Sequence, residues 1–212
     1  HNFFIGLAYL GGVDVEVDHE RALRLIRTAA ENGLKEAVEK LISMYTYEEG
    51  VKFDIKELAR WRNRLVLMLR KEYESAPDID KLEDYLRAYF ELCDACFLTA
   101  NYDLAERYLS EMMCDCEKLL GELEDDSEWL LTYRFLGLAN LHYGHMSYDT
   151  GRFDESQYHL EKSIKISQEV IESCDLDWFI RDNAIGYRIL SQLHLIRNEE
   201  KEAAECLHKC TA

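Results

Sequence analysis

Two pairs of potential metal ligands stand out in this chain of 212 residues. Cys93 and Cys96 form a Cys-x-x-Cys pair, which is a zinc-binding spacing when a second pair lies nearby. No second pair follows, and the two cysteines lie within an amphipathic helical pattern, so packing is the favoured interpretation. His142 and His145 share one helix face, where two imidazoles can chelate a metal. No carboxylate in the same turn completes that pair, so we expect no metal and no cofactor.

The sequence contains no motif of enzyme chemistry. It has no Gly-x-Gly-x-x-Gly, no phosphate-binding P-loop and no Gly-x-Ser-x-Gly. The acidic run at 122–128 lacks the alternating spacing and the glycine of a calcium loop, so we interpret it as a solvated connector between helices. The sequence therefore predicts a protein that is not an enzyme.

The overall charge and the scarcity of helix breakers restrict the fold and the partners. The formal net charge is −17, which repels phosphate backbones and anionic lipid surfaces, so neither nucleic acid nor a membrane is an expected partner. The charge favours partner proteins that carry basic patches. Only one Pro and ten Gly occur, which favours long helices over a turn-rich β fold.

The cysteines bear on the cellular compartment of the protein, and the ends of the chain bear on whether it is part of a longer one. Seven cysteines are an odd number, and the chain is too long for a disulfide-stapled miniprotein, so we expect reduced thiols in the cytoplasm. No apolar run approaches the ~18 residues of a membrane span. The chain opens at His1 within one helical pattern and ends at Ala212 within another. We therefore expect a fragment of a larger bacterial protein.

The first 70 residues contain an internal repeat. Residues 5–9 align with residues 41–45 at a shift of 36, and the same shift takes Asp18 to Asp54. Each aspartate stands directly before a second helical pattern, where its carboxylate can accept the free N–H groups of the first turn. Gly33 follows the first of these patterns, where a left-handed conformation ends a helix at little cost. The repeating unit is therefore a pair of helices.

These residues resemble the Sel1-like repeat family, over about residues 2–70. The matching positions of the first copy are Gly6, Tyr9, Gly12, Val13, Asp18, Ala22, Ala29, Ala30, Gly33 and Ala37. The second copy keeps Tyr45, Gly50, Val51, Asp54, Ala59 and Trp61. It has Leu65 and Val66 where the family has a pair of alanines, which is typical of a repeat at a boundary.

A second pattern follows the single proline at Pro77. Gly151 and Phe153 mark a turn, Gly144 precedes it, and Ser156 is the first small residue of the next helical pattern. Small residues at such positions let two helices cross closely. The pattern resembles the TPR family. Further copies lie at 101–109 and, with a weaker match, at 197–207.

The spacing of this second pattern predicts unusually long helices. The small positions Ala105, Ser156 and Ala203 are 51 and 47 residues apart, whereas an ordinary TPR repeats every ~34 residues. The helices of this part should therefore be longer than usual by two or more turns.

Together the two resemblances predict an all-α fold. We expect a right-handed α-solenoid of antiparallel helix pairs, a Sel1/TPR-like superhelix of about ten helices. Residues 1–74 form its Sel1-like part and residues 78–212 its TPR-like part, joined as one continuous solenoid with a boundary near Pro77.

The TPR resemblance also implies a groove for a partner. In TPR families, side chains of the first helix of each pair line a groove that holds a peptide. The resemblance places seven residues there: Phe90, Asp94, Leu141, His145, Tyr148, Arg188 and Gln192. Only Arg188 suits the carboxylate clamp of that family, so we do not expect binding of a chaperone tail. The alternative is that some of the seven pack against neighbouring helices.

The repeats predict a non-catalytic scaffold that mediates protein–protein or protein–peptide interaction. One alternative is a peptide-sensing regulatory module whose superhelix changes curvature. Another is a structural subunit that self-associates through its terminal helices. The identity of the partner and the oligomeric state stay open.

Overall fold

The computed structural model describes residues 2–173 and 178–211. Within these ranges it contains ten α-helices and no strand. The chain forms two compact units, His1–Thr99 (unit 1) and Ala100–Ala212 (unit 2). The prediction of an all-α fold is confirmed.

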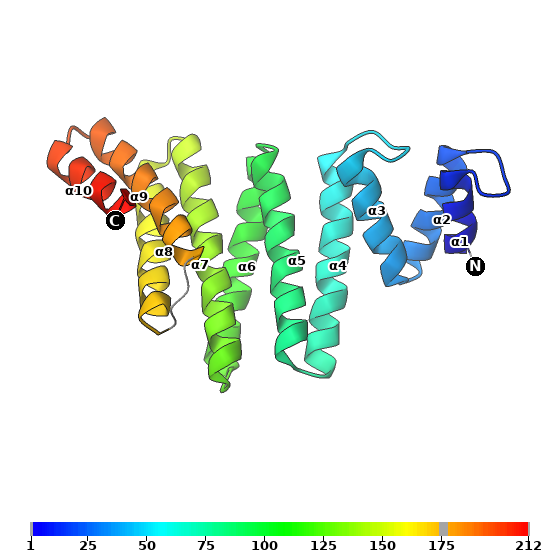
Figure 1. Cartoon of the computed structure of the whole chain (residues 1–212), viewed down its shortest axis with the longest axis horizontal. Coiled ribbons are helices and arrows are strands. Elements are labelled where there is room, and N and C mark those ends of the chain that lie inside the picture. Colours follow the sequence, from blue (N-terminus) through cyan, green and yellow to red (C-terminus); the bar gives the residue numbers. More distant parts are fainter. Residues whose placement is uncertain (1, 174–177, 212) are drawn as a thin grey trace. The chain divides into compact units, whose positions relative to one another are not determined.

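Unit 1 is a row of five helices, each packed against the next along the chain (Figure 1). They are α1 (Asn2–Gly11), α2 (His19–Glu31), α3 (Lys35–Tyr47), α4 (Ile55–Ser75) and α5 (Ile79–Leu98). The connections between them contain three to seven residues, and connections this short make neighbouring helices antiparallel.

Unit 2 contains the other five helices, again packed in chain order, with a further contact between α7 and α9 (Figure 1). They are α6 (Tyr102–Glu122), α7 (Asp126–Asp149), α8 (Phe153–Ser173), α9 (Trp178–Ile196) and α10 (Glu200–Thr211). The helices α6, α7 and α8 have 21, 24 and 21 residues, against 13 each for α2 and α3. The prediction of long helices in this part is confirmed.

The helix starts follow the repeat spacings. The helices α2 and α4 begin 36 residues apart, and α6, α8 and α10 begin at intervals of 51 and 47 residues. Asp18 accepts a hydrogen bond from the Arg21 N–H (2.9 Å), and Asp54 accepts one from the Lys56 N–H (2.9 Å). Both expected caps are therefore confirmed. Gly33 has a φ of +89° just beyond α2, which confirms the expected left-handed helix end.

The core of unit 1 explains one glycine of the Sel1-like pattern. A Cβ on Gly6 of α1 would lie 2.7 Å from Cγ1 of Ile26 on α2. The two helices therefore approach more closely than any larger residue would permit. Ile26 is fully buried, together with Leu41 and Met44 of α3.

A polar network ties α4 to the two preceding helices. Nη2 of Arg27 on α2 donates to Oη of Tyr45 on α3 (2.5 Å) and to Oε2 of Glu57 on α4 (2.8 Å). The same carboxylate oxygen accepts from Nε1 of Trp61 (3.3 Å). The network fixes the rotation of α4, because it holds one face of that helix against α2 and α3.

Unit 2 is held by a close crossing of α7 and α8. A Cβ on Gly144 would lie 2.8 Å from Cγ of Leu160, and Oγ of Ser156 donates to the Gly144 carbonyl (2.7 Å). Ala105, Ser156 and Ala203 are all buried. The small positions of the TPR-like pattern are therefore confirmed as packing positions.

Pro77 lies in the turn between α4 and α5, inside unit 1. The change of repeat type expected at this turn stays a prediction, as does the right-handed superhelix. No helix in the described part of the chain is both long and apolar enough to cross a membrane.

Candidate functional site

Two of the seven residues predicted for a partner groove lie on α5. Phe90 and Asp94 are both half-buried. Burial raises the pKa of the Asp94 carboxyl, the positive charge of Arg62 opposes that shift, and the negative charge of Glu91 adds to it. Both residues belong to unit 1, whereas the other five belong to unit 2.

Two of the five residues in unit 2 are engaged in packing. Leu141 is 4% exposed and is a member of the apolar core. Tyr148 packs against the same core, with its ring centroid 6.1 Å from that of Phe153. Leu141 therefore offers almost no surface to a partner.

The remaining three residues lie on α7 and α9. His145 Nε2 is 4.0 Å from a carboxylate oxygen of Asp149. Burial lowers the pKa of His145, the carboxylate of Asp149 opposes this, and the positive charge of Arg188 lowers the pKa further. The structure thus brings His145 and Arg188 within electrostatic reach of each other. Arg188 and Gln192 are exposed.

The histidine pair of α7 lies in a setting that disfavours the charged form. Burial lowers the pKa of His142 to about 4, and His145 adds to that shift. His159 of α8 stacks on Tyr143 with ring centroids 4.3 Å apart, and its Nδ1 lies 2.8 Å from Oδ1 of Asn140. Across the described residues, no three His, Cys, Asp or Glu side chains gather as metal ligands.

The Cys-x-x-Cys pair is part of the core. Cys93 and Cys96 are fully buried in α5, which confirms their interpretation as packing residues. Cys116 is also buried, and burial raises the pKa of its thiol to about 12. Cys114 is exposed, and Cys174 lies outside the described residues.

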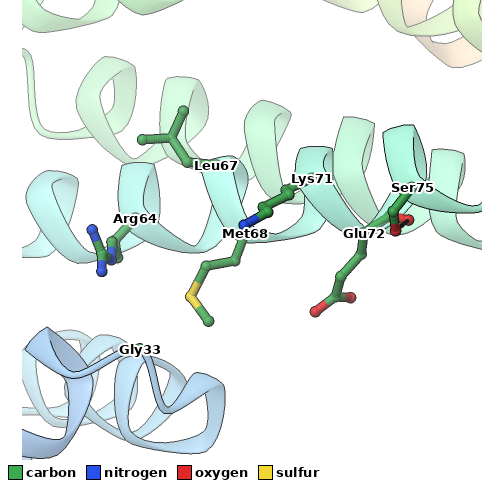
Figure 2. A pocket seen from close by; sticks show the side chains of 7 residues that line it. All are labelled: Gly33, Arg64, Leu67, Met68, Lys71, Glu72 and Ser75. Carbon is green, nitrogen blue, oxygen red and sulfur yellow. Dashed lines mark hydrogen bonds between the residues drawn. The ribbon is translucent and has the colours of Figure 1, made fainter.

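Hollows lined by both basic and apolar side chains lie along α4. Two hollows of about 530 and 290 Å³ follow each other along α4 and have Arg64 and Leu67 in common. Met68 and Glu72 point from α4 toward the turn that holds Gly33 (Figure 2). We call the two hollows the α4 groove, and define it by Arg60, Arg64, Leu67, Met68, Lys71 and Glu72 of α4 with Glu31 and Gly33 from the end of α2.

Helical spacing produces this groove. Trp61, Leu69 and Tyr73 are among the buried residues of α4. Arg60, Arg64, Leu67 and Lys71 follow one another at intervals of three or four residues, so they form a single stripe on another face of the helix. The side chain of Leu67 is 53% exposed in the middle of that stripe.

The charges in the groove are unevenly compensated. Glu72 is paired with Lys35 of α3 (3.0 Å), and Arg60 is paired with Glu31 and Glu57 (3.5 Å each). Among the residues that the structure describes, Arg64 and Lys71 take part in no ion pair. The groove therefore offers two uncompensated positive charges beside an exposed leucine.

Sequence reasoning did not identify this groove, although one signal pointed to it. The segment 55–75 contains six basic and three acidic residues, a net charge of +3 in a chain of net charge −17. A count of charge helix by helix would have found it. Which charges of the groove are left unpaired also depends on the ion pairs that α4 forms with α2 and α3. No local sequence pattern predicts these pairs.

Comparisons with known proteins give two helical repeat structures. No family model and no curated protein matches the chain. A protective antigen of uropathogenic Escherichia coli strains, with an SLR fold, aligns with 99% of this chain at 16% identity and a TM-score of 0.30. A Sel1 repeat protein from Oxalobacter formigenes aligns with 99% of this chain at 16% identity and a TM-score of 0.31.

The chain spans 60% of the length of the Escherichia coli protein and 86% of the Oxalobacter formigenes protein. The latter is named for the repeat family that residues 2–70 resemble, and both structures fall in the helical repeat class expected from the sequence. The ten helices of the described residues and their packing in chain order define the fold.

Proposed function

We propose that this chain is a non-catalytic helical scaffold that binds a segment of a partner protein in the α4 groove. The observation that carries the proposal is the exposed Leu67 between Arg64 and Lys71, both without an ion-pair partner among the described residues. An exposed apolar side chain flanked by free donors is the arrangement that a peptide segment can cover.

Residues of α7 and α9 are a second candidate region for partner contact. Of the seven residues that the TPR resemblance implies, Arg188 and Gln192 are exposed, and the positive charge of Arg188 lowers the pKa of the half-buried His145. A cytoplasmic location also belongs to the proposal, because the six cysteines of the described residues are free thiols.

The test is a selection of peptides of about 12 residues from a random display library on the purified chain, a length that exceeds the groove. Selected peptides are then measured on Leu67→Gln, which removes the apolar side chain without adding charge. Leu98→Gln is the matched control, because Leu98 is a 72% exposed leucine of the same unit outside the groove. We expect about tenfold weaker binding to Leu67→Gln and unchanged binding to the control.

Two results would overturn the proposal. One is a set of selected peptides that all bind Leu67→Gln as tightly as the unchanged chain. The other is a dimer, detected by light scattering, that Leu67→Gln dissociates, since the groove would then be the self-association surface of a structural subunit.

A further inference from the structure

We infer that the segment bound in the α4 groove is acidic, with an apolar side chain between carboxylates. The inference rests on the proposed function, since it names the chemistry of the partner at that site. It runs against the net charge of the chain, which favours basic partners.

The local charge of α4 is opposite in sign to that of the chain. Unit 1 contains 19 acidic and 14 basic residues, and unit 2 contains 23 acidic and 11 basic residues, so both units are negative. Within unit 1, α4 has a net charge of +3. The basic residues of this helix are therefore a local exception on a negative background.

Screening decides which of these charges a bound peptide experiences. The Debye length is about 8 Å at physiological ionic strength. A peptide in the groove therefore interacts with the charges that line it, and distant carboxylates contribute little. Of the lining charges, Glu72 and Glu31 are engaged by Lys35 and Arg60, which leaves the positive charges of Arg64 and Lys71 for a ligand.

The dimensions of the stripe define the ligand. Arg60 and Lys71 are eleven residues apart on one helix, which is about 16 Å at the helical rise. About five residues of extended chain cover that length. Arg64 and Lys71 lie on either side of Leu67 in the stripe, so carboxylates flanking an apolar residue would match all three.

An acidic protein segment fits this groove better than a nucleic acid or a membrane. A polyanion or a lipid surface is too large to be confined to one helix face, and it would also meet other carboxylates of unit 1. A short peptide avoids them. The exposed Leu67 gains apolar contact from such a peptide, which a phosphate backbone does not provide.

The experiment measures fluorescence anisotropy with labelled peptides of about 12 residues, a length set by the groove. The first peptide has a central leucine flanked by glutamates, and in the second every glutamate is replaced by glutamine. The receptor is the 212-residue chain, unchanged or as Arg64→Glu/Lys71→Glu. The control Lys52→Glu/Lys56→Glu changes the net charge equally in the same unit and outside the groove.

We expect saturable binding of the acidic peptide and about tenfold weaker binding of the glutamine peptide. Binding should weaken by about tenfold or more in Arg64→Glu/Lys71→Glu and stay within about twofold in the control. It should also weaken as NaCl rises from about 50 to about 500 mM, because exposed charge pairs are screened.

Other outcomes separate this inference from the proposed function. If the glutamine peptide binds as well as the acidic one and Leu67→Gln abolishes both, the acidic inference is overturned while the groove remains a docking site. If Leu67→Gln weakens the binding of neither designed peptide and of no library peptide, the proposed function fails as well. Tighter binding of phosphatidylserine–phosphatidylcholine vesicles or of polyuridylate RNA that requires Arg64 and Lys71 would also overturn the inference.

Discussion

The two units use the same antiparallel helix pairs but build different cores. The described core of unit 1 is apolar, whereas the described residues of unit 2 include seven buried polar ones: Thr132, Asn140, Ser147, Ser156, Ser163, Ser167 and Ser191. Several of these bond to helix carbonyls, such as Thr132 to Glu128 (2.8 Å) and Asn140 to Leu136 (2.8 Å). A hydroxyl or amide that bonds to a carbonyl of its own helix leaves no unpaired donor at a crossing; Ser147, whose hydroxyl has no partner among the described residues, is an exception. The two units therefore share buried alanines and large apolar residues, and they differ in the small polar side chains that the described core of unit 2 adds.

The units also differ in where their basic residues lie. In unit 1 six of the 14 basic residues belong to α4, and the groove there has two without an ion-pair partner in the described structure. In unit 2 Arg152 is paired with Glu106 (2.8 Å) and Lys162 with Glu117 (2.8 Å), so these charges tie helices together. Basic residues thus tie helices together in both units, and unit 1 in addition leaves Arg64 and Lys71 of α4 without an ion-pair partner among the described residues.

The largest expected loss of stability follows from removing the Trp61 side chain in the core of unit 1. Trp61 is 2% exposed, so Trp61→Ala should lower the free energy of unfolding by about 3–5 kcal/mol. Leu67→Ala on the exposed face of the same helix should change it by less than about 0.5 kcal/mol. Urea denaturation measures both variants, and hydrogen exchange by mass spectrometry locates the loss. An equal loss of protection in unit 2 would show that the two units unfold as one.

An intermediate effect is expected at the close crossing in unit 2. Gly144→Ala places a Cβ 3.1 Å from the backbone nitrogen of Leu160, so α7 and α8 must separate, and we expect a loss of about 1–3 kcal/mol. Gly121→Ala is the control, because a Cβ there meets nothing within 4 Å and a helical alanine should stabilise by about 0.5–1 kcal/mol. Thermal or urea unfolding of both variants measures these changes in the free energy of unfolding. Equal stability of the two alanine variants would contradict the role of the crossing.

The smallest of the three effects is a pH dependence specific to unit 2. Burial lowers the pKa of His142 from its ordinary value of 6.5 to about 4, so the folded state binds fewer protons than the unfolded chain between these two pH values. Stability should therefore rise with pH from about 4 to 6.5 and fall as the medium is acidified through that window. Between pH of about 6.5 and about 5 the loss of stability due to His142 should be about 1–2 kcal/mol, because each pH unit in this window costs up to about 1.4 kcal/mol.

Comparison of the unchanged chain with His142→Gln over this pH range isolates that contribution, since carboxylates titrate in both. The difference in unfolding free energy should grow with pH up to about 6.5 and then stay constant. A difference independent of pH would mean that the imidazole titrates equally in both states.

The TPR resemblance predicted the helices of unit 2 better than it predicted which side chains are exposed. The pattern located the helices and the small positions correctly, since Ala105, Ser156 and Ala203 are buried. It assigned Leu141 and Tyr148 to the groove, where the structure shows them in packing contacts of unit 2. Around the axis of a helix, buried and exposed positions can be only a few tens of degrees apart. The rotation of the helix about that axis decides which of them is buried, and this rotation depends on the neighbouring helices.

The sequence by itself determined the helices, their caps and the residues at close crossings. Asp18, Asp54 and Gly33 act within one helical turn, so local chemistry predicts them. The tertiary structure alone decided which charges are paired and which are not. Lys35 reaches Glu72 and Arg62 reaches Glu91 across 37 and 29 residues of chain, and only folding makes such pairs. Arg64 and Lys71 are exposed and have no ion-pair partner in the described structure, because Glu72 and Glu31, which line the same hollows, are paired with Lys35 and Arg60.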